Sequence, residues 1–106
     1  MEEGKWTNSE KKIARRVFDS ARQRELTELV FAFKQRAELS ETPDDVWAIA
    51  ESLLEQRRNI DRKYDFRYSQ LLLVFGRLVR EKRIQIEDVE GLSEEKLSIV
   101  GRIASL

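Results

Sequence analysis

The strongest constraint on the fold of this chain is one helix boundary, Thr42-Pro43-Asp44-Asp45, which follows a long stretch without any Gly or Pro. Thr42 suits the N-cap of a helix, and Pro43 suits the first helical position, where its missing N–H does no harm. The two acidic residues that follow lie at the positive end of the helix dipole. Upstream, Thr7-Asn8-Ser9-Glu10 fits a capping box. The pattern therefore predicts two long helices, over about 8–38 and 43–64, joined by a turn at 38–41.

Apolar residues recur at helical spacing along both predicted helices, with charged residues between them. In the first helix these positions are Ile13, Val17, Ala21, Leu29, Val30, Phe33 and Ala37. In the second they are Val46, Trp47, Ile49, Ala50, Leu53, Leu54, Ile60 and Tyr64. A first helix of about 31 residues would be roughly 46 Å long, whereas a compact domain of this size is roughly 33 Å across. We therefore expect an elongated helical hairpin whose far end projects from the body of the protein.

Beyond the hairpin, the sequence predicts a smaller helical unit. Segment 61–66 has few apolar residues and predicts a kink or a break, after which a second apolar block runs from Leu71 to about Lys82. Gly76 inside that block costs about 1 kcal/mol of helix stability relative to Ala and indicates close packing against another helix. We expect 83–91 to be irregular or to form a short helix around 86–90, and Ser93 to cap a last helix. The prediction is an all-α single domain over 1–106, with about 8–64 as a helical stalk and about 65–106 as a small head.

The composition excludes most enzyme chemistry. The chain has no Cys and no His, so it offers no disulfide, thiol nucleophile, His-based acid–base relay or ordinary zinc site. An acidic group at 87–95 lacks the glycine and the ligand spacing of a calcium loop, and is better explained as surface acid near a helix N-terminus. The sequence contains no phosphate-binding loop and no catalytic motif. We therefore expect a binding module, without cofactor or metal, and not an enzyme.

Charge and hydropathy argue against nucleic-acid and membrane binding. Twenty basic and twenty acidic side chains cancel, whereas a nucleic-acid binder normally has a basic excess. Basic clusters at 11–16, 57–63 and 77–83 alternate with acidic residues, which is typical of solvated helix faces. The longest apolar run, 71–75, is far shorter than the roughly 20 residues of a transmembrane helix. Residues 1–6 read as a polar leader without the features of a secretory signal, so we expect a cytoplasmic protein.

A second copy of the chain would cover the projecting hairpin. The first helix carries apolar residues outside its main stripe, and most soluble oligomers are symmetric homodimers. Trp47 is either an anchor in such an interface or a packed core residue. Glu51 and Arg57 are six positions apart and do not face each other on one helix, although a twofold axis would let them form reciprocal pairs. The open alternative is a compact bundle of three or four helices in which the first helix is broken.

Several runs of this sequence resemble the fluorescence recovery protein family of cyanobacteria. They are Arg24-Glu25-Leu26, Asp45-Val46-Trp47 and the segment from Arg57 to Arg67, of which I-D-x-K-Y-D-x-R, Ile60 to Arg67, is the most specific piece. The likeness continues through Val74-Phe75 to Leu106, so it spans the chain from about residue 9. The resemblance implies an elongated all-helical homodimer with a stalk and small heads. It also implies a regulator that binds the photoactivated orange carotenoid protein, speeds its return to the resting orange form and so ends fluorescence quenching at the phycobilisome.

The resemblance further implies the interaction sites. The stalk Trp and Arg of the family match Trp47 and Arg57, while Ala50 and Glu51 stand where cyanobacterial members often carry His and Asp. The predicted dimer or partner interface on the stalk comprises Trp47, Ala50, Glu51, Leu53, Leu54 and Arg57. On the head, Leu73 replaces an expected aromatic residue and Ile99 an expected Lys. The predicted head contact comprises Leu73, Phe75 and Ile99.

These replacements leave two hypotheses open beside activity on the orange carotenoid protein. One is a fluorescence-recovery-like dimer from a bacterium that lacks this photoprotein and uses a different protein partner. The other is a helical module that binds nucleic acid through the basic clusters, in which case its affinity would fall steeply with salt.

Overall fold

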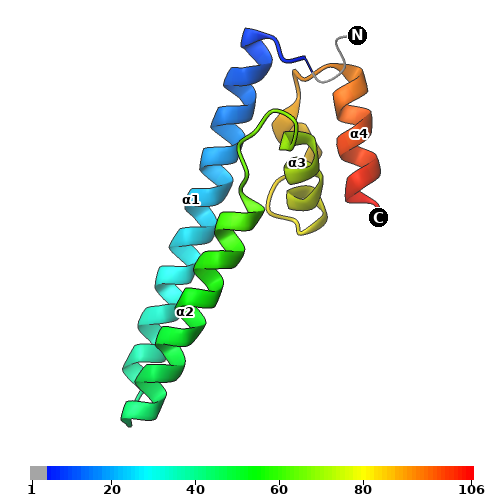
Figure 1. Cartoon of the computed structure of the whole chain (residues 1–106). Coiled ribbons are helices and arrows are strands. Elements are labelled where there is room, and N and C mark those ends of the chain that lie inside the picture. Colours follow the sequence, from blue (N-terminus) through cyan, green and yellow to red (C-terminus); the bar gives the residue numbers. More distant parts are fainter. Residues whose placement is uncertain (1–4) are drawn as a thin grey trace.

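A computed structural model describes residues 5–106, which form four α-helices and one 3-10 turn without any strand. The helices are α1 (Asn8–Leu39), α2 (Pro43–Lys63), α3 (Leu71–Arg80) and α4 (Glu94–Ala104), with the 3-10 turn η1 (Ile86–Val89) before α4 (Figure 1). The all-α prediction is therefore confirmed for these residues. Within them, no helix combines the length and the apolar character needed to cross a bilayer.

Both long helices begin where the sequence predicts. Thr7 Oγ1 accepts a hydrogen bond from the Glu10 backbone N at 3.1 Å, and the Glu10 carboxylate accepts one from the Thr7 N at 3.0 Å. Thr42 and Asp45 form the same reciprocal pair at the start of α2, with lengths of 3.1 and 3.2 Å. Each capping box satisfies backbone donors that the first helical turn leaves free. Because α1 continues unbroken for 32 residues, the alternative of a broken first helix is wrong.

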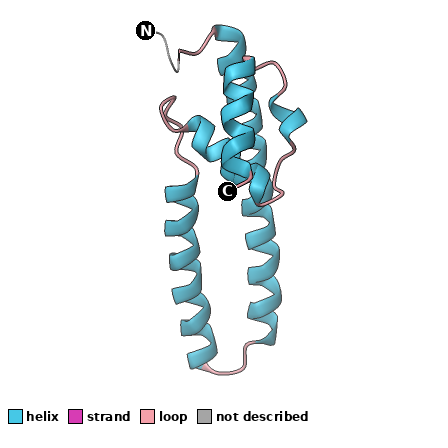
Figure 2. Cartoon of the chain, turned by 90° about the vertical axis from the view of Figure 1, so that its right-hand side faces the viewer, coloured by secondary structure: helices cyan, strands magenta, loops and turns pink. Residues whose placement is uncertain are grey.

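The molecule consists of a projecting pair of helices and a denser end. Helices α1 and α2 lie side by side and run in opposite directions, while α3, η1 and α4 pack beside the first half of α1 (Figures 1 and 2). The extents are 58 × 27 × 23 Å and the radius of gyration is 17.0 Å, against roughly 13 Å for a compact chain of this length. We call residues 22–59 the hairpin end. From here on, the head means the remaining described residues, which include the first part of α1 and the last residues of α2 as well as 65–106.

The hydrophobic core lies in the head. Its largest fully buried side chains are Leu71, Phe75, Leu78, Val89 and Val100. The first half of α1 contributes four buried apolar residues to the same cluster, Ala14, Val17, Phe18 and Ala21. Helix α3 packs so tightly on α4 that a Cβ at Gly76 would collide with the side chain of Ile103. The close packing inferred from this glycine is confirmed.

Two local predictions are wrong. Residues 1–4 of the predicted polar leader lie outside the described residues, but Trp6 is 6% exposed and belongs to the head core. Its ring packs 5.6 Å from the ring of Tyr68, a partner too distant in sequence for any local pattern to reveal. Helix α3 ends at Arg80, two residues before Lys82. Lys82 has φ 63°, and the Arg83 N donates to the Leu78 carbonyl at 2.8 Å, so a left-handed residue closes the helix.

The predicted break after the hairpin is confirmed. Helix α2 ends at Lys63, inside the segment 61–66 that is poor in apolar residues, and an irregular stretch leads to α3 at Leu71. The short helix expected around 86–90 is η1, and Ser93 Oγ accepts from the Lys96 N at 3.2 Å at the start of α4.

Candidate interaction surface

One side of α2 presents apolar side chains to solvent. Trp47 is 63% exposed and Leu54 is 54% exposed, and their separation of seven positions places them two turns apart on the same side of the helix. Ala50, Glu51 and Arg57 are also exposed, whereas Leu53 is half-buried. Within a single chain, therefore, the interpretation of Trp47 as a packed core residue is wrong.

Helix α1 extends this surface across the hairpin. Val30 and Phe33 are exposed apolar residues of its second half, and Leu26 and Leu29 are partly buried beside them. A groove between the two helices is lined by Leu26 and Leu29 from α1 and by Leu53 and Arg57 from α2. We call this combined surface the apolar face, made of Leu26, Leu29, Val30, Phe33, Val46, Trp47, Ala50, Leu53 and Leu54.

The two charged positions of the predicted interface lie at the border of the apolar face. The Arg57 Nε lies 4.0 Å from the Asp61 carboxylate, one turn farther along α2, and both side chains are largely exposed. Glu51 is exposed on the same helix. The reciprocal pairing of Glu51 with Arg57 across a twofold axis stays a prediction.

The predicted head contacts separate into surface and core positions. Leu73 on α3 is 55% exposed, and Ile99 on α4 is half-buried, so both reach solvent. Phe75 has no exposed surface, because its position on α3 faces the centre of the head core. A partner that docks on the folded head therefore does not touch Phe75. The prediction of Phe75 as a head contact is wrong.

A cluster of ionised groups joins α1, α2 and α3 where the hairpin meets the head. Lys63 Nζ lies 2.9 Å from the Glu25 carboxylate and 2.6 Å from that of Glu81, and the Lys63 side chain is only 7% exposed. The Tyr64 hydroxyl donates to Glu25 at 2.7 Å. The Arg83 Nε lies 3.2 Å from Glu25. We call Glu25, Lys63, Tyr64, Glu81 and Arg83 the junction cluster.

The junction cluster favours the ionised form of its acids. Burial alone would raise the pKa of Glu25, but hydrogen bonds from Lys63 and Tyr64 outweigh burial and hold that pKa below its ordinary value. The pKa of Glu81 is lowered in the same way, by Lys63 and Arg77 against the effect of burial. Burial and the Glu25 carboxylate together raise the pKa of Tyr64, so its hydroxyl keeps its proton and acts as a donor.

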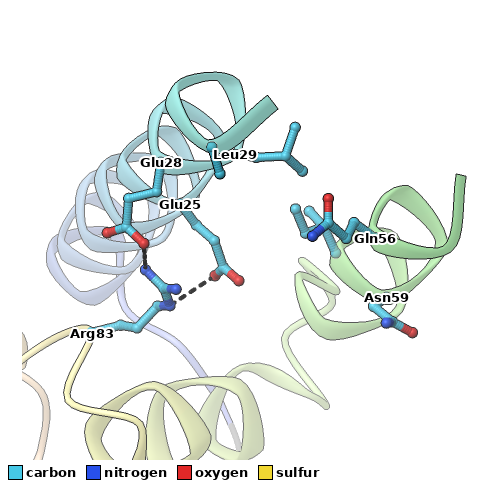
Figure 3. A pocket seen from close by; sticks show the side chains of 8 residues that line it. Glu25, Glu28, Leu29, Gln56, Asn59 and Arg83 are labelled. Atoms are coloured by element: carbon cyan, nitrogen blue, oxygen red, sulfur yellow. Dashed lines mark hydrogen bonds and ion pairs between the residues drawn. The ribbon is translucent and has the colours of Figure 1, made fainter. Parts of the chain in front are cut away.

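A pocket of about 340 Å³, lined by charged, amide and apolar side chains, lies beside this cluster between the two hairpin helices. Figure 3 shows Glu25, Glu28 and Leu29 of α1 across from Gln56 and Asn59 of α2, with Arg83 reaching up from the head. The Arg83 guanidinium pairs with both Glu25 and Glu28. The charged side chains that line this pocket are therefore already paired with one another.

The sequence does not reveal that Lys63 joins three helices through ion pairs. The residue stands in the most specific motif of the sequence, yet its partners Glu25 and Glu81 lie 38 and 18 positions away. From the sequence alone, a lysine in the last turn of a helix is normally explained by its favourable interaction with the negative end of the helix dipole. Only the tertiary structure shows that Lys63 is buried.

The acidic residues at 87–95 lie at the ends of η1 and α4. Across residues 5–106, no three acidic side chains are placed so that they could share a metal ion. The carboxylate of Asp88 instead accepts from the Gln85 N at 2.8 Å, and Ser93, Glu94 and Glu95 lie in the cap and first turn of α4. These acids are thus helix-terminal, as expected.

Comparison with known proteins gives concordant matches along nearly the whole chain. The family model for the photoprotection regulator fluorescence recovery protein matches residues 6–104. The fluorescence recovery protein of Synechocystis sp. PCC 6803 is 34% identical over 104 residues, which cover 98% of this chain and 95% of the relative. The solved fluorescence recovery proteins of Fremyella diplosiphon and Synechocystis sp. PCC 6803 superpose with a TM-score of 0.90, at 29% and 34% identity. Both superpositions cover 95% of this chain and 99% of the other.

Proposed function

This chain belongs to the fluorescence recovery protein family, and we propose from that premise that it is a homodimeric regulator that binds the photoactivated orange carotenoid protein and speeds its reversion to the resting form. The observation that carries the proposal is the family match over residues 6–104, together with 34% identity to a fluorescence recovery protein. Regulation of this kind requires tighter binding to the activated or the transition-like state than to the resting state, and no covalent step.

The apolar face supports a homodimer through the hairpin end. Of the residues at 22–59, only Ile49 is buried in the single chain, although both helices carry large apolar side chains. Contiguous exposed apolar surface of this kind is typical of protein interfaces, and Trp is enriched among the residues that contribute most to binding. A second copy of the same hairpin offers the same face, as a twofold interface requires.

Charge complementarity supports an antiparallel arrangement of the two hairpins. Between residues 37 and 56, around the hairpin turn, the sequence has Glu38, Glu41, Asp44, Asp45, Glu51 and Glu55 and no basic residue. Toward the head, α1 carries Lys11, Lys12, Arg15, Arg16, Arg22 and Arg24, with Asp19 as the one exposed acid among them. An antiparallel dimer lays the acidic turn of one protomer beside the basic head end of its partner. In this arrangement the basic cluster at 11–16 lies near the acidic turn of the partner and needs no nucleic acid.

The head contact that we propose consists of Leu73 and Ile99. The two residues lie on α3 and α4, the helices that pack around Gly76, and both have solvent-accessible surface. Their apolar side chains suit an apolar patch on the partner protein, whereas a lysine at the Ile99 position would suit a carboxylate.

The decisive experiment adds the purified protein to photoactivated orange carotenoid protein and follows the return of the orange absorbance in darkness. We expect the recovery rate to rise with the concentration of this protein, and the variant Leu73→Glu to weaken the effect without changing the oligomeric state. Phe31→Glu, an equally drastic change on the exposed side of α1 away from the apolar face, is the matched control.

An unchanged recovery rate over the whole concentration range would show that the orange carotenoid protein is not the partner. The family assignment and the dimer would then stand, and the apolar head contact would point to a different protein partner. Retardation of DNA or RNA at low salt would instead support binding of nucleic acid.

A further inference from the structure

We propose that the junction cluster is a clamp that holds the end of α2 in register on α1, with Lys63 and Tyr64 as positioning residues for the apolar face. This inference rests on the proposed function, because it assigns to the cluster the task of preforming the surface through which two copies pair. The cluster lies outside the apolar face and outside the proposed head contact, so neither of those surfaces accounts for it.

The hairpin needs such a clamp because little else holds its helices together. Along 22–59, Ile49 is the one buried side chain, and the half-buried Leu29 and Leu53 contribute part of their surface. The turn at one end fixes the helices through the Thr42–Asp45 capping box. At the other end, α2 leaves the hairpin at Lys63, and there the junction cluster supplies the contacts to α1.

The geometry of the cluster specifies one position of α2. The Lys63 ammonium lies between a carboxylate of α1 and a carboxylate at the end of α3, at 2.9 and 2.6 Å. The Tyr64 ring meets the Phe18 ring edge-on with centroids 5.4 Å apart, while its hydroxyl reaches Glu25. A buried charge loses its partners if the helix slides or rotates, so each alternative register leaves ionised groups unpaired.

The register matters for the apolar face because its two halves come from different helices. Leu26 and Leu29 of α1 must stay beside Leu53 and Arg57 of α2 to line one groove. A rotation of α2 by one residue would turn each of its side chains by about 100° and break up the surface. A clamp that fixes α2 before a second copy arrives lowers the ordering cost of association.

The test separates clamping from general support of the fold. Lys63→Met removes the ammonium, and Tyr64→Phe removes one hydroxyl while keeping the ring on Phe18. Amide hydrogen exchange is measured on variants that also carry Trp47→Glu, so that dimerisation does not affect the exchange rates. The dimer dissociation constant is measured on the same variants without Trp47→Glu. The matched control is Asp65→Asn, which breaks the exposed Asp65–Arg67 pair in the same segment.

We expect both clamp variants to exchange about tenfold faster at the amides of 53–63, with the amides of α3 and α4 unchanged, and to raise the dimer dissociation constant about tenfold. The control should match the parent in both measurements.

Unchanged exchange at 53–63, or an equal rise in the exchange rates of α3 and α4, would overturn the proposed clamp. A dimer dissociation constant that stays constant despite faster exchange would overturn the link to pairing. A parent chain that never dimerises would refute the proposed homodimer, and the exchange data would still decide whether the clamp exists.

Discussion

At the scale of single residues, the two tryptophans have opposite environments. Trp6 packs into the head, where the Lys96 ammonium lies 5.2 Å from the centre of its ring. Trp47 projects from α2 with most of its surface in water. Burial of such a large side chain is worth several kcal/mol in an interface, so Trp47 is the residue whose replacement should most affect pairing.

Trp47→Glu should convert the dimer into single chains, because it places an unpaired carboxylate in the apolar interface. A cost of about 3 kcal/mol or more would weaken association by at least about 100-fold. Light scattering measures the outcome as a mass close to 12.5 kDa at micromolar concentration. The control is Phe31→Glu, since Phe31 is as exposed as Trp47 but lies about 140° around α1 from Leu26. Equal behaviour of the two variants would contradict the assignment of the apolar face.

Two glycines in helices should respond to alanine with opposite sign. Gly76→Ala places a Cβ against Ile103 at the α3–α4 contact, and we expect a loss of about 1–3 kcal/mol from overpacking. Gly101→Ala adds a Cβ to an open side of α4, with nothing within 4 Å, and should gain about 0.5–1 kcal/mol from helix propensity. Urea denaturation of both variants measures the change in unfolding free energy. A stabilising Gly76→Ala would show that the two helices are not held at this distance.

At the scale of elements, ionised side chains join helices that are distant in sequence. Glu10 connects α1 to the start of α4, because its carboxylate accepts from the Ser93 N at 2.8 Å and lies 3.3 Å from the Lys96 ammonium. Burial raises the pKa of Glu10, but the backbone donors of Thr7 and Ser93 and the Lys96 ammonium outweigh it and lower that pKa. Glu25 and Glu81 likewise connect α1, α2 and α3 through Lys63, and the pKa of each is lowered.

The pH dependence of stability follows from these acids. A carboxyl whose pKa is lower in the folded state than its ordinary 4.5 stabilises the fold fully above 4.5, and this contribution is lost as the pH falls through the lowered folded pKa. We therefore expect the urea midpoint to be constant near neutrality and to fall steeply below 4.5. Glu25→Gln should be less stable near neutrality and lose less on acidification. A midpoint that rises on acidification would contradict the assigned pKa directions.

The helices were predictable from sequence to the extent that their signals are local. Thr7 and Thr42 each bond a residue three positions away, so the starts of both long helices can be read from a few residues. The packing of Trp6 and the burial of Lys63 depend on groups many positions distant, which no periodicity encodes. The exposure of Trp47 was one of two open alternatives, because an apolar stripe looks the same whether it faces its own chain or a second copy.

At the scale of the whole molecule, zero net charge conceals a strong segregation of charge. The hairpin turn is acidic over twenty residues, whereas the head end of α1 is basic. A parallel pair of hairpins would place acid beside acid at the turn, and an antiparallel pair places acid beside base. The distribution of charge therefore favours one of the two orientations that the apolar face alone would allow.

Salt should weaken the dimer. The charges at the turn and on the head end of α1 are exposed, and the screening length falls from about 14 Å to about 4 Å between roughly 50 and 500 mM sodium chloride. We expect the dissociation constant to rise severalfold over this range in sedimentation experiments. Asp44→Lys should weaken the dimer at low salt, whereas Glu94→Lys on α4 should not. Tighter association at high salt would favour the parallel orientation.

The unbroken course of α1 gives the molecule a mechanical property. One helix of 32 residues, roughly 48 Å long, supplies both part of the head core and half of the apolar face. In the proposed antiparallel dimer, two such helices paired along their hairpin ends would form a stiff rod with a head at each end. Helix geometry, and not a flexible linker, would then set the spacing between the two heads. Such a dimer would bind two partner sites at once only where their separation matches the distance between its heads.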